Sequence, residues 1–149
     1  MAAIAAGRRW SVSGDGGGSI EVDSVWIHLD AQSRPARIED FGVYAQATAG
    51  RHVSTKLHLP DPPRDAERVP WPLRATDVDL HGHVNNAVYW QAVEDTLGDA
   101  VDLRAPLRAE LDFREPIDLG EALELAVAAD MVGFVVGDGV SAVARLDGT

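Results

Sequence analysis

The feature that most constrains the fold is a nearly uninterrupted apolar stretch within residues 86–97, where a helix is predicted. Its apolar side chains leave almost no polar face: Ala87, Val88, Tyr89, Trp90, Ala92 and Val93. A helix that is apolar all round has to be enclosed by other elements. The rest of the chain must therefore provide a cover for it.

Strands predicted around this helix can provide the cover. Residues 69–75 alternate in polarity, and Pro70 and Pro72 suit a strand at a sheet edge. Residues 107–113 alternate apolar and charged side chains, which is typical of a half-buried strand. Further strands are predicted over 123–127, 134–136 and 140–146, with turns at Gly120, Gly133 and 137–139. The pattern predicts an α+β fold in which an antiparallel sheet is wrapped around one long central helix.

The first half of the chain is organised differently. Strands are predicted over 8–13 and 19–30, joined by the glycine turn 14–18. A change of apolar parity at Asp23-Ser24 predicts a β-bulge, and residues 39–48 are expected to form a short helix. Three prolines among charged residues then indicate a linker over residues 58–68.

Composition excludes several classes of function. The chain has no cysteine, so disulfides, thiolate metal sites and cysteine nucleophiles are excluded. Its net charge of −11 argues against nucleic acid and anionic membranes as partners. No apolar run reaches the roughly 20 residues of a membrane span, and no secretion signal is recognised, so a cytoplasmic protein is expected. Basic residues balance acidic ones up to residue 74, nine of each, whereas four face fifteen afterwards.

The densest group of polar side chains lies just before the predicted helix, between residues 76 and 86. Alternate residues of an extended segment share a face, so Asp77, Asp79, His81 and His83 are expected to point the same way. Asn85 and Asn86 follow at the helix start. This position directs polar groups towards the mouth of the core.

The run over residues 79–89 resembles the Asp-x-Asn-x-His-Val-Asn-Asn-x-x-Tyr signature of acyl-acyl carrier protein (acyl-ACP) thioesterases. Residues 25–30 and 34–37 resemble the end of that family's first hotdog repeat, and residues 113–115 resemble its later glutamate segment. The resemblance implies a hotdog fold with a partial first repeat over 1–57, a linker over 58–68 and a complete second repeat over 69–149.

The resemblance also implies the catalytic residues. The family's aspartate, histidine and glutamate fall on Asp79, His83 and Glu115, while His81 stands in place of its asparagine. Pro116 replaces the cysteine of many plant members, so a cysteine mechanism cannot operate. His83 is expected to take a proton from water, with Asp79 or Glu115 fixing its tautomer. Backbone N–H groups around residues 85–88 are expected to hold the oxyanion.

By resemblance, the predicted function is hydrolysis of a fatty acyl thioester to free fatty acid and holo-ACP, in fatty acid biosynthesis. Acyl carrier protein is the expected partner, and neither a cofactor nor a metal is expected. Carrier proteins of this kind are acidic, so docking is predicted on the first half of the chain, which carries Arg34, Arg37, Arg51 and Lys56.

Several alternatives stay open on sequence alone. Asn85 and Asn86 can cap the helix, with or without a catalytic role. His81 and His83 can be ordinary surface residues, or metal ligands together with Asp77 or Asp79. The carrier can be coenzyme A instead of ACP. The chain can also be a truncated, non-catalytic hotdog module that binds acyl groups or pairs with a second copy as a homodimer.

Overall fold

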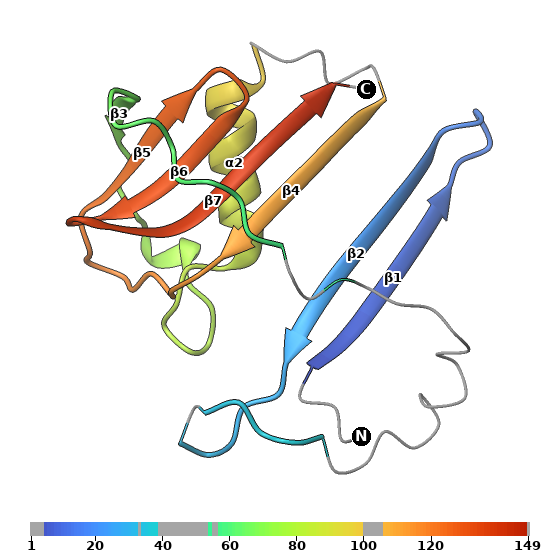
Figure 1. Ribbon diagram of the computed structural model, residues 1–149, viewed down its shortest axis with the longest axis horizontal. Coiled ribbons are helices and arrows are strands. Elements are labelled where there is room, and N and C mark those ends of the chain that lie inside the picture. The colour runs from blue at the N-terminus through green and yellow to red at the C-terminus, as the bar shows by residue number, and fades with distance from the viewer. Residues whose placement is uncertain (1–4, 33, 39–53, 55–56, 100–105, 149) are drawn as a thin grey trace. The chain divides into compact units, whose positions relative to one another are not determined.

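A computed structural model describes residues 5–32, 34–38, 54, 57–99 and 106–148 (Figure 1). The chain divides into two compact units, residues 1–57 and residues 58–149, and each is considered by itself. The division falls where the linker over 58–68 is predicted to begin. The short helix predicted over residues 39–48 lies outside the described residues.

In the first unit, strands β1 (Ala5–Ser13) and β2 (Ser19–Ile27) form the predicted antiparallel hairpin. The glycine turn between them needs Gly17, which adopts a φ of +83°. The predicted bulge is wrong, because the pairing register runs unbroken from Ala5↔Ile27 to Ser13↔Ser19. The change of apolar parity in β2 instead places apolar side chains on both faces of the ribbon.

The second unit is an antiparallel sheet with one α-helix on it, as predicted. The helix α2 spans Asn86–Leu97, the same bounds that the apolar pattern gives. The strands are β3 (Glu67–Pro70), β4 (Leu107–Phe113), β5 (Leu123–Ala128), β6 (Met131–Val136) and β7 (Gly139–Gly148). They are ordered β3-β5-β6-β7-β4, so β3 lies at an edge, as expected (Figure 1). The strand predicted over 69–75 is wrong in its bounds, because β3 begins inside the predicted linker and ends at Pro70.

The helix is less enclosed within this unit than its composition predicts. Its fully buried residues share one face and pack on the sheet: Tyr89, Ala92, Val93 and Leu97. Val88 and Trp90 are only partly buried at the margin of the same core. The expectation of a helix enclosed on all sides is therefore wrong for this unit, because its sheet covers one side of α2. Within the described residues, no helix is long and apolar enough to span a membrane.

Strand β4 has the predicted bounds, and its predicted apolar face does lie towards α2, where Leu111 packs on the core and Phe113 contacts Tyr89, but this face is only partly covered. Phe113 remains 48% exposed, whereas Asp112 is buried. The alternation is real, but β4 is an edge strand with a neighbour on one side only. Residues 58–62 cover the opposite side at Asp112, which is why this charged residue is buried.

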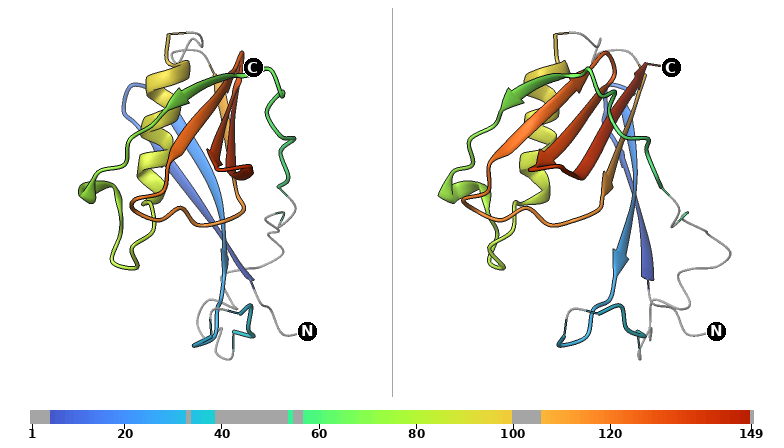
Figure 2. Two further views of the ribbon diagram at one scale, coloured as in Figure 1. Left: turned by 90° about the vertical axis from the view of Figure 1, so that its left-hand side faces the viewer. Right: turned by 60° about the vertical axis from the view of Figure 1, so that its left-hand side comes forward.

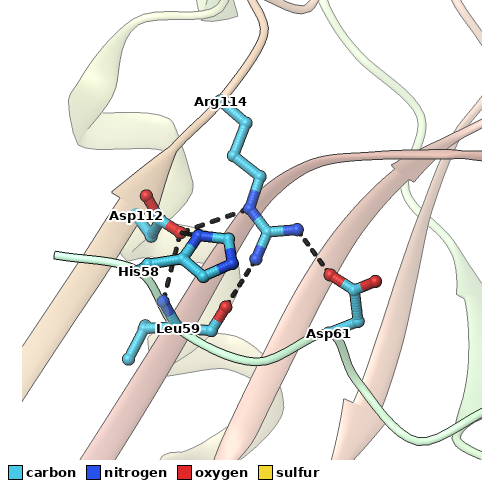
Figure 3. Close-up of polar contacts among 5 residues, drawn as sticks. All are labelled: His58, Leu59, Asp61, Asp112 and Arg114. Atoms are coloured by element: carbon cyan, nitrogen blue, oxygen red, sulfur yellow. Dashed lines mark hydrogen bonds and ion pairs between the residues drawn. The ribbon is translucent and has the colours of Figure 1, made fainter. Parts of the chain in front are cut away.

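The segment predicted as a linker lies on the face of the sheet opposite α2 (Figure 2). Leu59 is buried there with Met131 and Val143 in a small second core. Its N–H donates to the Asp112 carboxylate at 3.2 Å, and its carbonyl accepts from Arg114 at 2.6 Å (Figure 3). Arg114 also donates to Asp61. Residues 58–62 are thus an outer strap of the second unit, packed and hydrogen-bonded to it.

The glycines of the second unit divide between turns and close packing. Gly120 and Gly137 have φ values of +98° and +58° and lie in turns, as predicted. The turn predicted at Gly133 is wrong, because Gly133 lies inside β6 and pairs with Ala126 and Val143. The turn between β5 and β6 falls instead at Ala129-Asp130.

Candidate active site

The polar loop before α2 is held closed at both ends. A short 3₁₀ helix, η1 (Ala75–Asp77), follows β3. The buried Asp77 accepts the Arg74 N–H on its carboxylate at 2.7 Å and the Asn85 N–H on its carbonyl at 2.8 Å. The next pair, Val78 and Val84, forms an antiparallel bridge. Residues 77–85 therefore form one compact loop whose two ends are hydrogen-bonded to each other. The prediction that Asp77, Asp79, His81 and His83 share one face of an extended segment is wrong, because the segment folds back on itself and buries Asp77.

Asp79 shapes the tip of this loop. Its carboxylate accepts the backbone N–H groups of His81 at 2.8 Å and His83 at 3.3 Å. The Asp79 N–H donates to the His83 carbonyl at 2.8 Å, which closes the turn. Gly82 lies in the left-handed region with a φ of +84°, where a side chain would be strained. The carboxylate that the sequence assigns to catalysis is thus engaged with the main chain.

The imidazole of His83 lies against a different carboxylate. Its Nδ1 is 2.6 Å from Oδ1 of Asp118, and the backbones of the two residues form an antiparallel bridge. The adjacent Val84 N–H donates to the backbone carbonyl of the buried Ile117 at 2.8 Å. Residues directly opposite in such a pair project to the same side, so the main chain itself brings the two side chains together. Asp118 is not among the site residues predicted from the sequence.

Asp118 is itself held in a tight turn. Its N–H donates to Oε2 of Glu121 at 2.7 Å, and the Glu121 N–H returns to the Asp118 carbonyl at 3.3 Å. Gly120, with its positive φ, allows the chain to turn between them. The backbone of Asp118 is therefore fixed by bonds that do not involve its own side chain.

The start of α2 lies immediately after His83. Asn85 is the N-cap, and its side-chain oxygen accepts the Ala87 N–H at 2.9 Å, so the capping interpretation is confirmed for Asn85, whereas Asn86 is the first residue of the helix itself. The Val88 N–H donates to the Asn85 carbonyl at 2.9 Å. Among the four N–H groups predicted to hold an oxyanion, only that of Asn86 has no acceptor within the described part of the chain.

Two predicted residues lie apart from the His83 ring. His81 is exposed at the tip of the loop. Glu115, which follows the end of β4, is also exposed, and its backbone N–H donates to the Ser141 carbonyl at 3.1 Å. In the described residues, neither side chain forms a hydrogen bond or ion pair with the imidazole of His83, whose ring is paired with Asp118. No cluster of three potential metal ligands occurs in the same part of the chain.

Glu121 lies near the buried Tyr89 and also lines a cavity. Burial raises the pKa of Tyr89 to about 12, with a further contribution from the nearby Glu121 charge. Tyr89 stacks edge-on against Phe113 and contacts Phe134. A cavity of about 440 Å³ is lined by residues 70–72 and 121–124 together with Gly137. The cavity lining shares only Glu121 with the turn that holds Asp118.

Comparison with solved structures identifies the fold. An acyl-ACP thioesterase from Bacteroides thetaiotaomicron superposes with a TM-score of 0.68 at 15% identity, over 96% of this chain and 62% of that chain. A Lactobacillus plantarum protein described as an oleoyl thioesterase gives 0.64 at 19% identity, with the same coverage. The α+β sheet and helix are therefore a hotdog fold, as the resemblance implies.

Sequence comparison identifies the family. Two uncharacterised proteins, from two strains of Mycobacterium tuberculosis, are each 37% identical over 145 residues. The matches cover 93% of this chain, which spans 58% of the length of those relatives. Residues 61–137 match the model of the acyl-ACP thioesterase C-terminal domain, a stretch that includes both the 77–85 loop and the turn at Asp118. More than half of the chain matches this model, so the protein belongs to the acyl-ACP thioesterase C-terminal domain family.

Proposed function

We propose that this protein hydrolyses a fatty acyl thioester carried on acyl carrier protein, releasing the free fatty acid and the carrier thiol. One observation carries the proposal: the His83 imidazole lies at the start of α2 with Nδ1 2.6 Å from a carboxylate. An imidazole held this way can take a proton from water near neutral pH. The family membership supports a thioester as the bond that this water attacks.

The reaction needs only a base and an oxyanion site. Nε2 of His83 takes a proton from water while the water oxygen attacks the thioester carbonyl. The carbonyl electrons move onto oxygen, and the N–H of Asn86 at the positive end of α2 is the group proposed to hold that charge. When the tetrahedral intermediate collapses, the C–S bond breaks and the thiolate leaves. His83 returns its proton to the sulfur, and a thiol with a pKa of about 8.5 needs no stronger acid.

The other predicted site residues have supporting roles in this proposal. Asp79 fixes the turn that carries His83, through its bonds to the His81 and His83 N–H groups. Asn85 caps the helix and so maintains the orientation of the Asn86 N–H. His81 and Glu115 are exposed, and their proposed part in the reaction rests on the family resemblance alone.

The proposed carrier is the least constrained part of the function. Acyl carrier protein follows from the family, and an acidic carrier is expected to approach basic side chains. Arg51 and Lys56 lie outside the described residues. Arg34 is committed to Asp30, with its Nη2 2.9 Å from Oδ2, whereas Arg37 is exposed. Among the described residues, Arg37 is therefore the best candidate for a carrier contact.

Matched acyl chains on the two carriers test this function. The full 149-residue chain is supplied with medium- and long-chain acyl groups on acyl carrier protein and on coenzyme A, and release of free thiol is followed. We expect a higher kcat/KM on acyl carrier protein. A higher value on coenzyme A would assign the acyl-CoA alternative. Absence of turnover on both would favour a non-catalytic acyl-binding module.

A further inference from the structure

The carboxylate beside the His83 ring belongs to a residue 35 positions further along the chain, outside the polar loop that the sequence singles out. We propose that Asp118 is a positioning residue for the reaction: it holds the His83 ring with Nδ1 protonated and Nε2 directed to water. The inference rests on the proposed hydrolysis, and assigns to Asp118 the role that the sequence assigns to Asp79 or Glu115.

The backbone pairing of His83 with Asp118 indicates that their side chains do not meet by chance. His83 and Asp118 are bridge partners, and the neighbouring Val84 N–H is bonded to the fully buried Ile117. The pairing is thus anchored one residue away, in the core. Since opposite residues of an antiparallel pair project together, the ring and the carboxylate meet without either chain segment having to move.

The contact dictates the tautomer of the ring. An ionised carboxylate only accepts hydrogen bonds, so the Nδ1 that lies 2.6 Å from it carries the hydrogen. A neutral imidazole has one such hydrogen, which leaves the lone pair on Nε2. That nitrogen is the one available to take a proton from water.

Asp79 does not take this role in this conformation, where the Nδ1 of His83 is already paired with Asp118. Its Oδ1 already accepts the N–H groups of His81 and His83, which places its carboxylate against the main chain of the turn. Asp79 therefore determines where the imidazole is carried, and Asp118 determines which way the ring faces. Glu121 in turn holds Asp118 in place, because its carboxylate accepts the Asp118 N–H at 2.7 Å.

The exposure of the pair sets the size of the expected effect. The side chains of His83 and Asp118 are 46% and 63% exposed, and ion pairs at such sites contribute little to folding. The Asp118 backbone is held by its own turn, so truncation of the side chain should leave the fold intact. Loss of orientation should lower kcat by less than loss of the base itself, which is expected to cost about 10²- to 10⁴-fold.

The test compares Asp118→Ala, Asp118→Asn and Asp118→Glu in the full chain, with Asp138→Ala in the exposed β6–β7 turn as a matched loss of charge. Ring-nitrogen NMR reports the tautomer of His83, and its signals are assigned with His83→Ala. We expect protonation at Nδ1 in the wild type and in Asp138→Ala, and a shift towards Nε2 in Asp118→Ala. The Asn variant, whose amide both donates and accepts, should give a mixture.

Turnover provides the second readout. On an acyl carrier protein thioester, Asp118→Ala should lower kcat with little change in KM, and Asp118→Glu should restore part of it. An unchanged tautomer, or unchanged kcat in Asp118→Ala while His83→Ala is inactive, would overturn the inference. The wild type could also hydrolyse none of the thioesters while the tautomer of His83 still depends on Asp118. That result would refute the proposed function but leave the pairing of His83 with Asp118 standing.

Discussion

The ring of Pro62 occupies the space where a side chain on Gly133 would begin: its Cγ is 2.5 Å from the position of a Cβ on that glycine. Gly133 lies in the middle of β6, and Pro62 belongs to the outer strap. The strap can therefore lie flat on the sheet only because this position has no side chain.

Gly133→Ala is accordingly expected to destabilise the second unit. The added methyl group meets a rigid proline ring, and overpacking of this kind costs about 1–3 kcal/mol. Urea denaturation of the variant and the wild type measures the difference. Gly139→Ala is the matched control, because its added Cβ would meet its nearest atom at an ordinary 3.6 Å. Equal stability of Gly133→Ala and Gly139→Ala would show that the strap does not pack as described.

The buried Tyr89 predicts a loss of stability at high pH. Its pKa is raised from 10.0 to about 12, first by burial and then by the Glu121 charge. Between these two pH values the unfolded chain releases the tyrosine proton and the folded chain keeps it, so the free energy of unfolding falls as pH rises. Below pH 10 both states hold the proton and this contribution is constant.

Melting temperatures over this range, for the wild type and Tyr89→Phe, test the sign. Phenylalanine keeps the aromatic contacts and has no proton to lose, so its melting temperature should fall less steeply above pH 10. Parallel curves for the two proteins would contradict a tyrosine that stays protonated in the fold.

Charge reversal at Arg37 tests the proposed docking surface. Arg37→Glu should raise the KM for an acyl carrier protein thioester by several-fold at low salt, because the carrier is acidic. Turnover of an acyl thioester of a small neutral thiol should be unchanged. Arg64→Glu, an exposed reversal in the second unit, is the matched control. Unchanged KM and unchanged salt dependence in Arg37→Glu would refute this surface.

Local patterns were sufficient to predict the α-helix and the five strands of the second unit in their order along the chain, and the bounds of two of these elements. The bounds of α2 and β4 follow from apolar runs and alternation, and the edge position of β3 follows from Pro70 and Pro72. These features depend on near neighbours in the sequence, and a single sequence records them directly.

Features that depend on distant segments could not be predicted in this way. The alternation of β4 does not reveal that the strap buries Asp112, or that Phe113 stays 48% exposed on an edge strand. Asp118 has no distinguishing pattern around it, and only the bridge to His83 gives it meaning. The only sequence feature near Asp118 that could have drawn attention to it is Gly120, whose positive φ allows the turn that joins Asp118 to Glu121. The motif therefore led to the histidine and not to its carboxylate.

The claim on which the rest depends is that His83 is the base. The most direct measurement is kcat of the full chain and of His83→Ala on an acyl carrier protein thioester, with folding checked by circular dichroism. His58→Ala, a highly exposed histidine on the outer strap, is the control. Loss of a general base should lower kcat by about 10²- to 10⁴-fold in His83→Ala and leave His58→Ala at the wild-type rate. A folded His83→Ala that turns over at the wild-type rate would contradict the account.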